Sequence, residues 1–183
     1  MPATLLLIDI QKGFHHPGWG ERNNHQAEAN ALRLLTHWRE KGWPVVHIQH
    51  LSTTPGSTLH PQSVWEGERG ADFQTGFEPL PGEVHLTKNV NSAFIGTDLE
   101  QRLRAAAVTQ LVIAGLTTDH CVSTTTRMAA NLGFDVVLVS DAIATFEREF
   151  DGQRFSADEI HRIHLASLSG EFATVKPTAA LLT

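Results

Sequence analysis

Cys121 is the only cysteine of the sequence and its most reactive side chain. It lies in the segment 111–123, LVIAGLTTDHCVS, an apolar run that breaks at Gly115 and passes through two threonines into an expected helix. Buried parallel strands read as continuous apolar runs, and helices begin where capping residues follow. A thiol in the first helical turn lies at the positive end of the helix dipole, which favours the thiolate. A lone cysteine is often just a small buried hydrophobe, but this strand–turn–helix context favours a nucleophile.

Asp9 and Lys88 each stand where another expected strand ends. Asp9 interrupts the apolar run 3–10, and Lys88 directly follows the run 83–87. A buried unpaired carboxylate is costly, so Asp9 is expected to be a helix cap, a salt-bridge partner or a catalytic base. The carboxyl ends of parallel strands meet along one edge, where ligands bind in open α/β sheets. We therefore expect Asp9, Lys88 and Cys121 to lie together.

These three side chains are suited to nucleophilic catalysis. A carboxylate can take the proton of a thiol, and a nearby ammonium holds both groups in their charged forms. No histidine is required if Asp9 is partly desolvated and carries the proton. Backbone N–H groups of the turn 115–121 are placed to stabilise an oxyanion, and each such donor is worth about 3 kcal/mol.

Strands and helices alternate along the chain. Apolar runs predict six strands, at 3–10, 43–49, 83–87, 110–114, 135–140 and 172–175. Helical periodicity and stop signals predict helices at 24–41 and 97–108, one that carries Cys121 and ends at 132, and one at 156–169. The predicted helices 97–108 and 156–169 each begin with a capping-box pattern, Thr97–Glu100 and Ser156–Glu159. The alternation predicts an α/β fold of three αβα layers, Rossmann-like, with a mostly parallel six-stranded sheet; its strand order stays open.

The segment 50–81 has no regular hydrophobic period. Long irregular stretches inside a compact domain are more often functional loops than accidents. Its aromatic residues are expected either to line a pocket or to form a subunit contact: Trp65, Phe73 and Phe77.

Composition narrows the functional class. The chain has 183 residues, enough for one domain spanning 1–183, with 41% hydrophobic and 19% charged residues. A formal net charge of −6 gives no basic face for nucleic acid. The apolar run 5–8 is too short for a signal peptide or a membrane span, and one cysteine forms no internal disulfide. We expect a cytoplasmic protein that binds neither nucleic acid nor membrane.

Three segments of the chain resemble the isochorismatase-like cysteine hydrolases, a superfamily that includes nicotinamidases, N-carbamoylsarcosine amidohydrolases and ureidoacrylate amidohydrolases. The segments are LLLIDIQKGF, TKNVNSAFIGTDLEQRLR and LVIAGLTTDHCVSTTTRMAANLGFDVVLVSDAIAT. The third is specific, whereas the first two would be weak alone. The resemblance spans most of the chain and is weakest in the loop after the second strand.

This resemblance implies a division of roles among the site residues. Asp9 would be the general base, Lys88 its charged companion and Cys121 the nucleophile, in hydrolysis of a small amide, carbamoyl or ureido compound through a thioester. A cis peptide at Leu116–Thr117 would aim the Thr117 N–H at the oxyanion beside that of Cys121. The resemblance also implies a homo-oligomer, either a dimer or a tetramer.

Other positions are carried over on the same resemblance. Residues expected to line the substrate pocket are Gln11, Phe14 and Phe94. Asp119 and His120, which precede the nucleophile, are expected to brace the loop rather than to touch substrate.

No metal or other cofactor is expected, although the sequence contains 11 histidines. The nicotinamidase branch has an Asp-x-His pair after its second strand, where this chain has His50 and Ser52. This departure puts nicotinamide in doubt as a substrate, while His50, His60 and His85 could still form some metal site. The helical pair His161 and His164 is expected to be a solvated face.

Three other functions remain open. Isochorismatases of this fold cleave a vinyl ether and need no nucleophilic cysteine. A non-catalytic small-molecule-binding member of the fold would not need the complete Asp–Lys–Cys set. A thiol sensor would lack a resolving cysteine in this chain.

Overall fold

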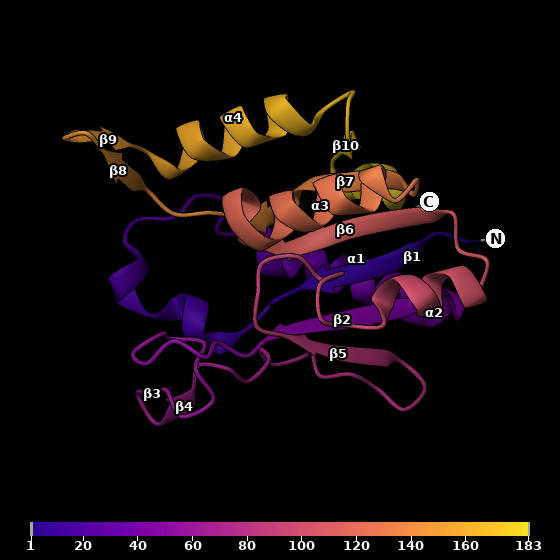
Figure 1. The fold of residues 1–183 in the computed structure, drawn as a ribbon, viewed down its shortest axis with the longest axis horizontal. Coiled ribbons are helices and arrows are strands. Elements are labelled where there is room, and N and C mark those ends of the chain that lie inside the picture. The colour runs from indigo at the N-terminus through magenta and orange to yellow at the C-terminus, as the bar shows by residue number, and fades with distance from the viewer. Residues whose placement is uncertain (1, 183) are drawn as a thin grey trace.

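The computed structural model describes residues 2–182, and its centre is a six-stranded sheet (Figure 1). The strand order is β10-β7-β6-β1-β2-β5, and every neighbouring pair is parallel. The strands are β1 (Thr4–Ile8), β2 (Val45–His50), β5 (Val84–Lys88), β6 (Gln110–Leu116), β7 (Asp135–Ala144) and β10 (Thr174–Lys176). The direction of winding reverses between β1 and β6, and ligands bind at such a switch point in open α/β sheets.

Helices cover both faces of this sheet, as the sequence predicts. Alternate side chains of β1 point to opposite faces, so Leu5 and Leu7 pack against Leu34 of α1 while Leu6 and Ile8 belong to the opposite core cluster. That second cluster contains residues of α2, α3 and α4. The helices are α1 (Ala27–Lys41), α2 (Leu99–Ala105), α3 (Ser123–Asn131) and α4 (Ala157–Leu168). The three-layer αβα fold is confirmed.

The two predicted capping boxes have different outcomes. At α4 the box forms: the Ser156 hydroxyl accepts from the Glu159 N–H at 3.3 Å, and the Glu159 carboxylate accepts from the Ser156 N–H at 2.8 Å. At α2 the prediction is wrong, because the Thr97 hydroxyl donates to the Ala93 carbonyl at 2.6 Å and the helix begins only at Leu99. The predicted stop of α1 at Gly42 is confirmed, with φ of 64°.

The segment after β2 is mostly irregular and folds back onto the residues that follow β1. It contains only β3 (Val64–Trp65) and β4 (Glu68–Arg69), and it packs on the 3₁₀ turns Lys12–His15 and Pro17–Trp19. The contact needs glycine: a Cβ on Gly70 would lie 1.9 Å from the Thr58 carbonyl oxygen. The Gly13 N–H donates to the Gly70 carbonyl at 2.7 Å, which fixes the loop beside the carboxyl end of β1.

A hairpin of β8 (Arg148–Phe150) and β9 (Gln153–Phe155) links the sheet to α4 and was not predicted from the sequence. It projects from the body of the molecule, and the Phe150 side chain is 77% exposed (Figure 1). Within residues 2–182 no helix combines the length and the apolar character needed to cross a membrane.

Candidate active site

Four side chains meet at the carboxyl edge of the sheet. The Lys88 ammonium lies 2.5 Å from Asp9 Oδ2, 3.3 Å from Cys121 Sγ and 3.1 Å from His50 Nδ1. The side chains of Asp9 and Lys88 are fully buried, and Cys121 is 6% exposed. The structure therefore brings together the three residues that the strand ends predict, and it adds His50 to them.

Gly115 lets the two central strands approach closely enough to form this cluster. Its φ of 131° lies in the region that side chains disfavour, and a Cβ there would be 2.0 Å from the Ile8 carbonyl oxygen. Because β1 and β6 pair at this point, Asp9 after one strand faces the turn after the other. Asp9 itself has a φ of 50°, which turns the chain away from the sheet edge.

The nucleophile turn, residues 117–122, connects β6 to α3. The peptide bond between Leu116 and Thr117 is cis, the geometry that the resemblance implies. We expected Cys121 in the first turn of an α-helix. It lies instead in the π-helical turn Thr118–Val122, which precedes α3 (Ser123–Asn131). The Thr117 carbonyl closes this turn by accepting from the Val122 N–H at 3.2 Å. Single π-turns are often found at functional sites.

Asp119 braces the nucleophile turn, as expected. Its carboxylate accepts from the Thr145 hydroxyl at 2.5 Å and from Arg148 Nε at 2.9 Å. Burial alone would raise the pKa of Asp119, but the Thr145 hydrogen bond and the charges of His120 and Arg148 hold it below its usual value. The His120 side chain is 49% exposed, and its Nε2 lies 3.5 Å from Asp119.

His161 was expected on a solvated helix face, and this expectation is wrong. Its side chain is buried, and Nδ1 lies 3.0 Å from the Thr118 hydroxyl of the nucleophile turn. Burial lowers the pKa of His161, so the ring stays neutral. The helical spacing places His161 and His164 on one face of α4, but it does not reveal that the nucleophile turn packs against that face.

Burial dominates the electrostatics of the cluster. It raises the pKa of Asp9, although the Lys88 ammonium opposes it. It also raises the pKa of Cys121 strongly, and the neighbouring Asp9 carboxylate adds to the effect. The expected thiolate at rest is therefore wrong, because desolvation and the adjacent carboxylate outweigh the lysine and the helix dipole. Burial thus favours the neutral form of both groups, and the Lys88 ammonium opposes it at both.

Asn91 is a further neighbour of the sulfur that the sequence did not single out. Its Oδ1 lies 3.8 Å from Cys121 Sγ, and its side chain is exposed. A pocket of about 220 Å³ is lined in part by Lys88, but neither Asn91 nor Cys121 lines it. The other lining residues are Leu51, Thr87, Asn89 and Gly96. Asn91 lies in the segment after β5 and not at the strand end, so the argument from strand ends did not identify it.

Comparison with known proteins identifies this architecture. The model of the Isochorismatase domain matches residues 3–179. The chain belongs to the isochorismatase family. YrdC of Bacillus subtilis (strain 168), an uncharacterized isochorismatase family protein, is 49% identical over 98% of this chain and 94% of its own.

Solved structures agree with this assignment. An isochorismatase-family protein from Chromobacterium violaceum ATCC 12472 superposes with a TM-score of 0.91 at 46% identity, covering 98% of this chain and 91% of its own. A cysteine hydrolase from Pseudomonas syringae pv. phaseolicola 1448A gives 0.84 at 26% identity, covering 98% and 90%. Members of the isochorismatase family are hydrolases, and this chain is similar to a cysteine hydrolase among them.

In this isochorismatase-family chain, the residues predicted to line the substrate pocket make close contacts with other residues of the protein. Gln11 is fully buried; its Nε2 donates to the carbonyls of His50 and Ala71 at 2.9 and 2.6 Å, and its Oε1 accepts from the His50 N–H at 2.8 Å. Its amide is thus used to hold His50 and the loop, leaving no hydrogen-bonding group exposed to a substrate. Phe14 is buried and stacks on Phe146.

Phe94 is half-buried and belongs to a different apolar cluster from Phe14. Its ring stacks on Phe134 with centroids 6.0 Å apart, and it packs against the core cluster that contains Cys121. Both phenylalanines thus take part in aromatic packing, and their contact with a substrate stays a prediction.

One group within residues 2–182 has a composition suited to a metal ion. Ligand atoms of Asp9, His50 and Cys121 lie within 4.8 Å of one another. The Lys88 ammonium already contacts all three side chains, and a positive charge there opposes binding of a cation. His60 and His85 do not belong to the group, since His60 accepts from the Gln62 N–H and His85 pairs with Gln49. The residues do not fit a resident metal.

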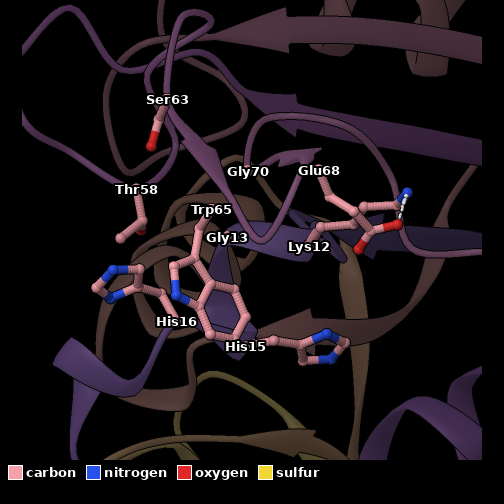
Figure 2. Close-up of a pocket in the computed structure, with 9 residues that line it drawn as sticks. All are labelled: Lys12, Gly13, His15, His16, Thr58, Ser63, Trp65, Glu68 and Gly70. Carbon is pink, nitrogen blue, oxygen red and sulfur yellow. Dashed lines mark hydrogen bonds and ion pairs between the residues drawn. The ribbon is translucent and has the colours of Figure 1, made fainter.

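A second, smaller pocket lies where the loop folds over the residues after β1 (Figure 2). Trp65 stands at its centre with His16 packed edge-on at 5.5 Å, and an ion pair of 2.7 Å joins Lys12 to Glu68. Asp9, Lys88 and Cys121 do not line it. Of the other loop aromatics, Phe73 packs between His47 and His85, and Phe77 is part of the core. The three aromatic residues thus have three different environments.

Proposed function

We propose that this protein is a cysteine hydrolase that cleaves a C–N bond of a small amide, carbamoyl or ureido compound. The observation that carries the proposal is the position of Lys88, whose ammonium lies within hydrogen-bond distance of both Asp9 Oδ2 and Cys121 Sγ. A buried cation between an acid and a thiol stabilises whichever of the two is negative, so it lowers the cost of passing the proton between them.

The first step is proton transfer followed by attack. Asp9 Oδ1 is buried without a hydrogen-bond partner among residues 2–182, and it is available for the thiol proton. The Cys121 thiolate then attacks the carbonyl carbon, and the carbonyl electrons move onto oxygen. We assign the backbone N–H groups of Thr117 and Cys121 as donors to this oxyanion.

The remaining steps return each group to its starting state. Protonated Asp9 gives its proton to the departing nitrogen, so the C–N bond breaks and an amine or ammonia leaves a thioester. Asp9, again a carboxylate, removes a proton from water, and the resulting hydroxide equivalent attacks the thioester. The acid product departs, and Asp9 returns its proton to the sulfur. The raised pKa of Asp9 suits a group that must act as both base and acid near neutral pH.

Ammonia release from a panel of small primary amides and ureido acids tests this proposal. With Cys121→Ala we expect turnover of any substrate found to fall by at least about a thousandfold, because no other group can form the thioester. Retained turnover in this variant would contradict the thioester route, because it would show hydrolysis without a covalent thiol. A thioester trapped on the native protein and identified by mass spectrometry at the peptide containing Cys121 would support the covalent route directly.

A further inference from the structure

His50 is held in one orientation beside the buried cluster. It is the last residue of β2, and its backbone N–H and carbonyl both bind the side-chain amide of Gln11, at 2.8 and 2.9 Å. Its Nδ1 lies 3.1 Å from the Lys88 ammonium. A histidine fixed at the backbone and through the ring has little freedom to turn, so its second ring nitrogen also has a defined position.

The chemistry of Lys88 determines the tautomer of His50. An ammonium group has three donors and no acceptor, so the nitrogen that faces it must present a lone pair. Nδ1 is therefore unprotonated, and in the neutral ring the proton is on Nε2. Burial and the Lys88 charge both lower the pKa of His50, which keeps the ring neutral. His50 therefore cannot act as the general base, because its lone pair is already bound to lysine.

The Nε2–H group is free for a ligand. Within residues 2–182 it has no hydrogen-bond partner, and it is absent from the side-chain atoms that are fully buried and unpartnered. By contrast, the side chains of Asp9 and Lys88 are fully enclosed. His50 is half-buried, which makes it the most exposed member of the cluster, and one of its two ring nitrogens lies within 4.8 Å of Cys121 Sγ.

We infer that His50 is a substrate-contacting residue that donates its Nε2–H to a second acceptor atom of the substrate, close to the scissile carbonyl. This inference rests on the proposed function and deepens it. The oxyanion is assigned to backbone donors, so the histidine donor is matched by a further oxygen or nitrogen acceptor. The structure therefore favours compounds with a further carbonyl or carboxylate oxygen beside the scissile group, such as α-oxo amides, over simple alkyl amides, since the latter lack a second acceptor.

Two substitutions at His50 distinguish the role of Nδ1, which accepts from Lys88, from the proposed role of Nε2 as a donor. In His50→Asn the amide oxygen can still accept from Lys88 near the Nδ1 position, but no donor reaches the position of Nε2. In His50→Gln the longer amide places an N–H near Nε2, but the acceptor for Lys88 is lost. His85→Gln is the matched control, because His85 lies on the neighbouring strand, is exposed and pairs only with Gln49.

The measured quantity is the ratio of kcat/KM for an amide with a second acceptor to kcat/KM for an alkyl amide of similar size. We expect His50→Asn to lower this ratio by about tenfold, the contribution of one well-placed hydrogen bond. His50→Gln should keep the ratio within about threefold of the native value while lowering both rates, and His85→Gln should change neither. An unchanged ratio in His50→Asn, with turnover that still depends on Cys121, would overturn the inference and leave the proposed function standing.

A measurement without substrate tests the tautomer itself. Nitrogen-15 NMR of histidine-labelled protein distinguishes the two ring nitrogens, and the His50 signals are assigned by their loss in His50→Asn. We expect a neutral ring with the proton on Nε2 at neutral pH. A proton on Nδ1, or an imidazolium, would refute the role of His50 as an Nε2–H donor, whether or not an amide substrate has been found.

Discussion

In two clusters of the described chain a carboxylate meets a cation and a histidine from β2, and the two are set up in opposite ways: the Asp9 cluster is buried and the Glu83 cluster is partly exposed. Glu83 accepts from Arg39 Nε and Nη2 at 2.7 and 2.9 Å, from His47 Nε2 at 2.8 Å and from the Leu80 N–H at 2.8 Å. Asp9 accepts from Lys88 through one oxygen, and its other oxygen is buried without a partner among residues 2–182.

This difference in hydrogen bonding reverses the pKa shifts. Burial alone would raise the pKa of Glu83, but the bonds from Arg39, Leu80 and His47 lower it to about 2. For Asp9 burial prevails over the single cation, and the pKa is raised. A carboxylate whose two oxygens both accept hydrogen bonds stays charged and serves as a structural anchor. A carboxylate with one oxygen unpaired can exchange protons. The comparison explains why only one of the two clusters is suited to catalysis.

Removing the charge of Asp9 should give the largest effect. We expect Asp9→Asn to lower kcat/KM by about a thousandfold, because the group that moves the proton is lost. The same change should increase the reactivity of Cys121 toward iodoacetamide at neutral pH. The carboxylate raises the pKa of the thiol, so its removal lowers that pKa and increases the thiolate fraction, with Lys88 still present.

The contrast between the two readouts is what tests the role of Asp9. Turnover and alkylation that fall together would show that Asp9 maintains the structure of the site rather than carrying a proton. Cys121→Ala is the control for alkylation, since it removes the only thiol of the chain.

Neutralising Glu83 should affect stability. Its folded pKa of about 2 lies below the ordinary glutamate value of 4.5, so its contribution is fully present above pH 4.5 and is lost as the pH falls toward 2. A shift of this size corresponds to about 3 kcal/mol of unfolding free energy at neutral pH. We expect Glu83→Gln to lose an amount of this order in urea unfolding near neutral pH and to match the native protein more closely near pH 2.

Glu40→Gln provides the matched control for this experiment, because Glu40 is exposed on α1. A stability deficit in Glu83→Gln that did not shrink in acid would show that its cause is packing rather than charge. Catalytic turnover should change little, since Glu83 lies outside the Lys88 cluster.

The sequence predicts one of these clusters and misses the other for a physical reason. Asp9, Lys88 and Cys121 lie at or shortly after the end of a strand, and the carboxyl ends of parallel strands converge, so position along the chain implies proximity. Glu83, Arg39 and His47 come from a loop, the end of a helix and the middle of a strand. Their contact depends on the path of the loop before β5, and no local pattern specifies that path.

Local patterns also proved insufficient when tertiary contacts competed with them. The Ser156 hydroxyl caps α4 by accepting from the Glu159 N–H, and it also donates to the Glu159 carboxylate, whereas the Thr97 hydroxyl donates to the Ala93 carbonyl instead of forming the predicted box. Likewise, the helix dipole predicts a lowered pKa for Cys121, but enclosure by the core and the nearby carboxylate raises it. The fold and the proximity of Asp9, Lys88 and Cys121 followed from the sequence, while the pKa shifts required the packing.

The smallest expected effect comes from reducing the number of donors to Glu83 while keeping the charge. Arg39→Lys replaces a two-pronged contact by a single ammonium, so the carboxylate should lose about 1 kcal/mol of stabilisation. The pKa of Glu83 should rise toward its ordinary value, and the acid unfolding midpoint should move to higher pH. Lys41→Arg at the exposed end of the same helix is the control, with no shift expected. If Arg39→Lys left the midpoint unchanged, the charge of the cation, rather than the number of its hydrogen bonds, would be what keeps Glu83 ionised, and the explanation for its difference from Asp9 would fail.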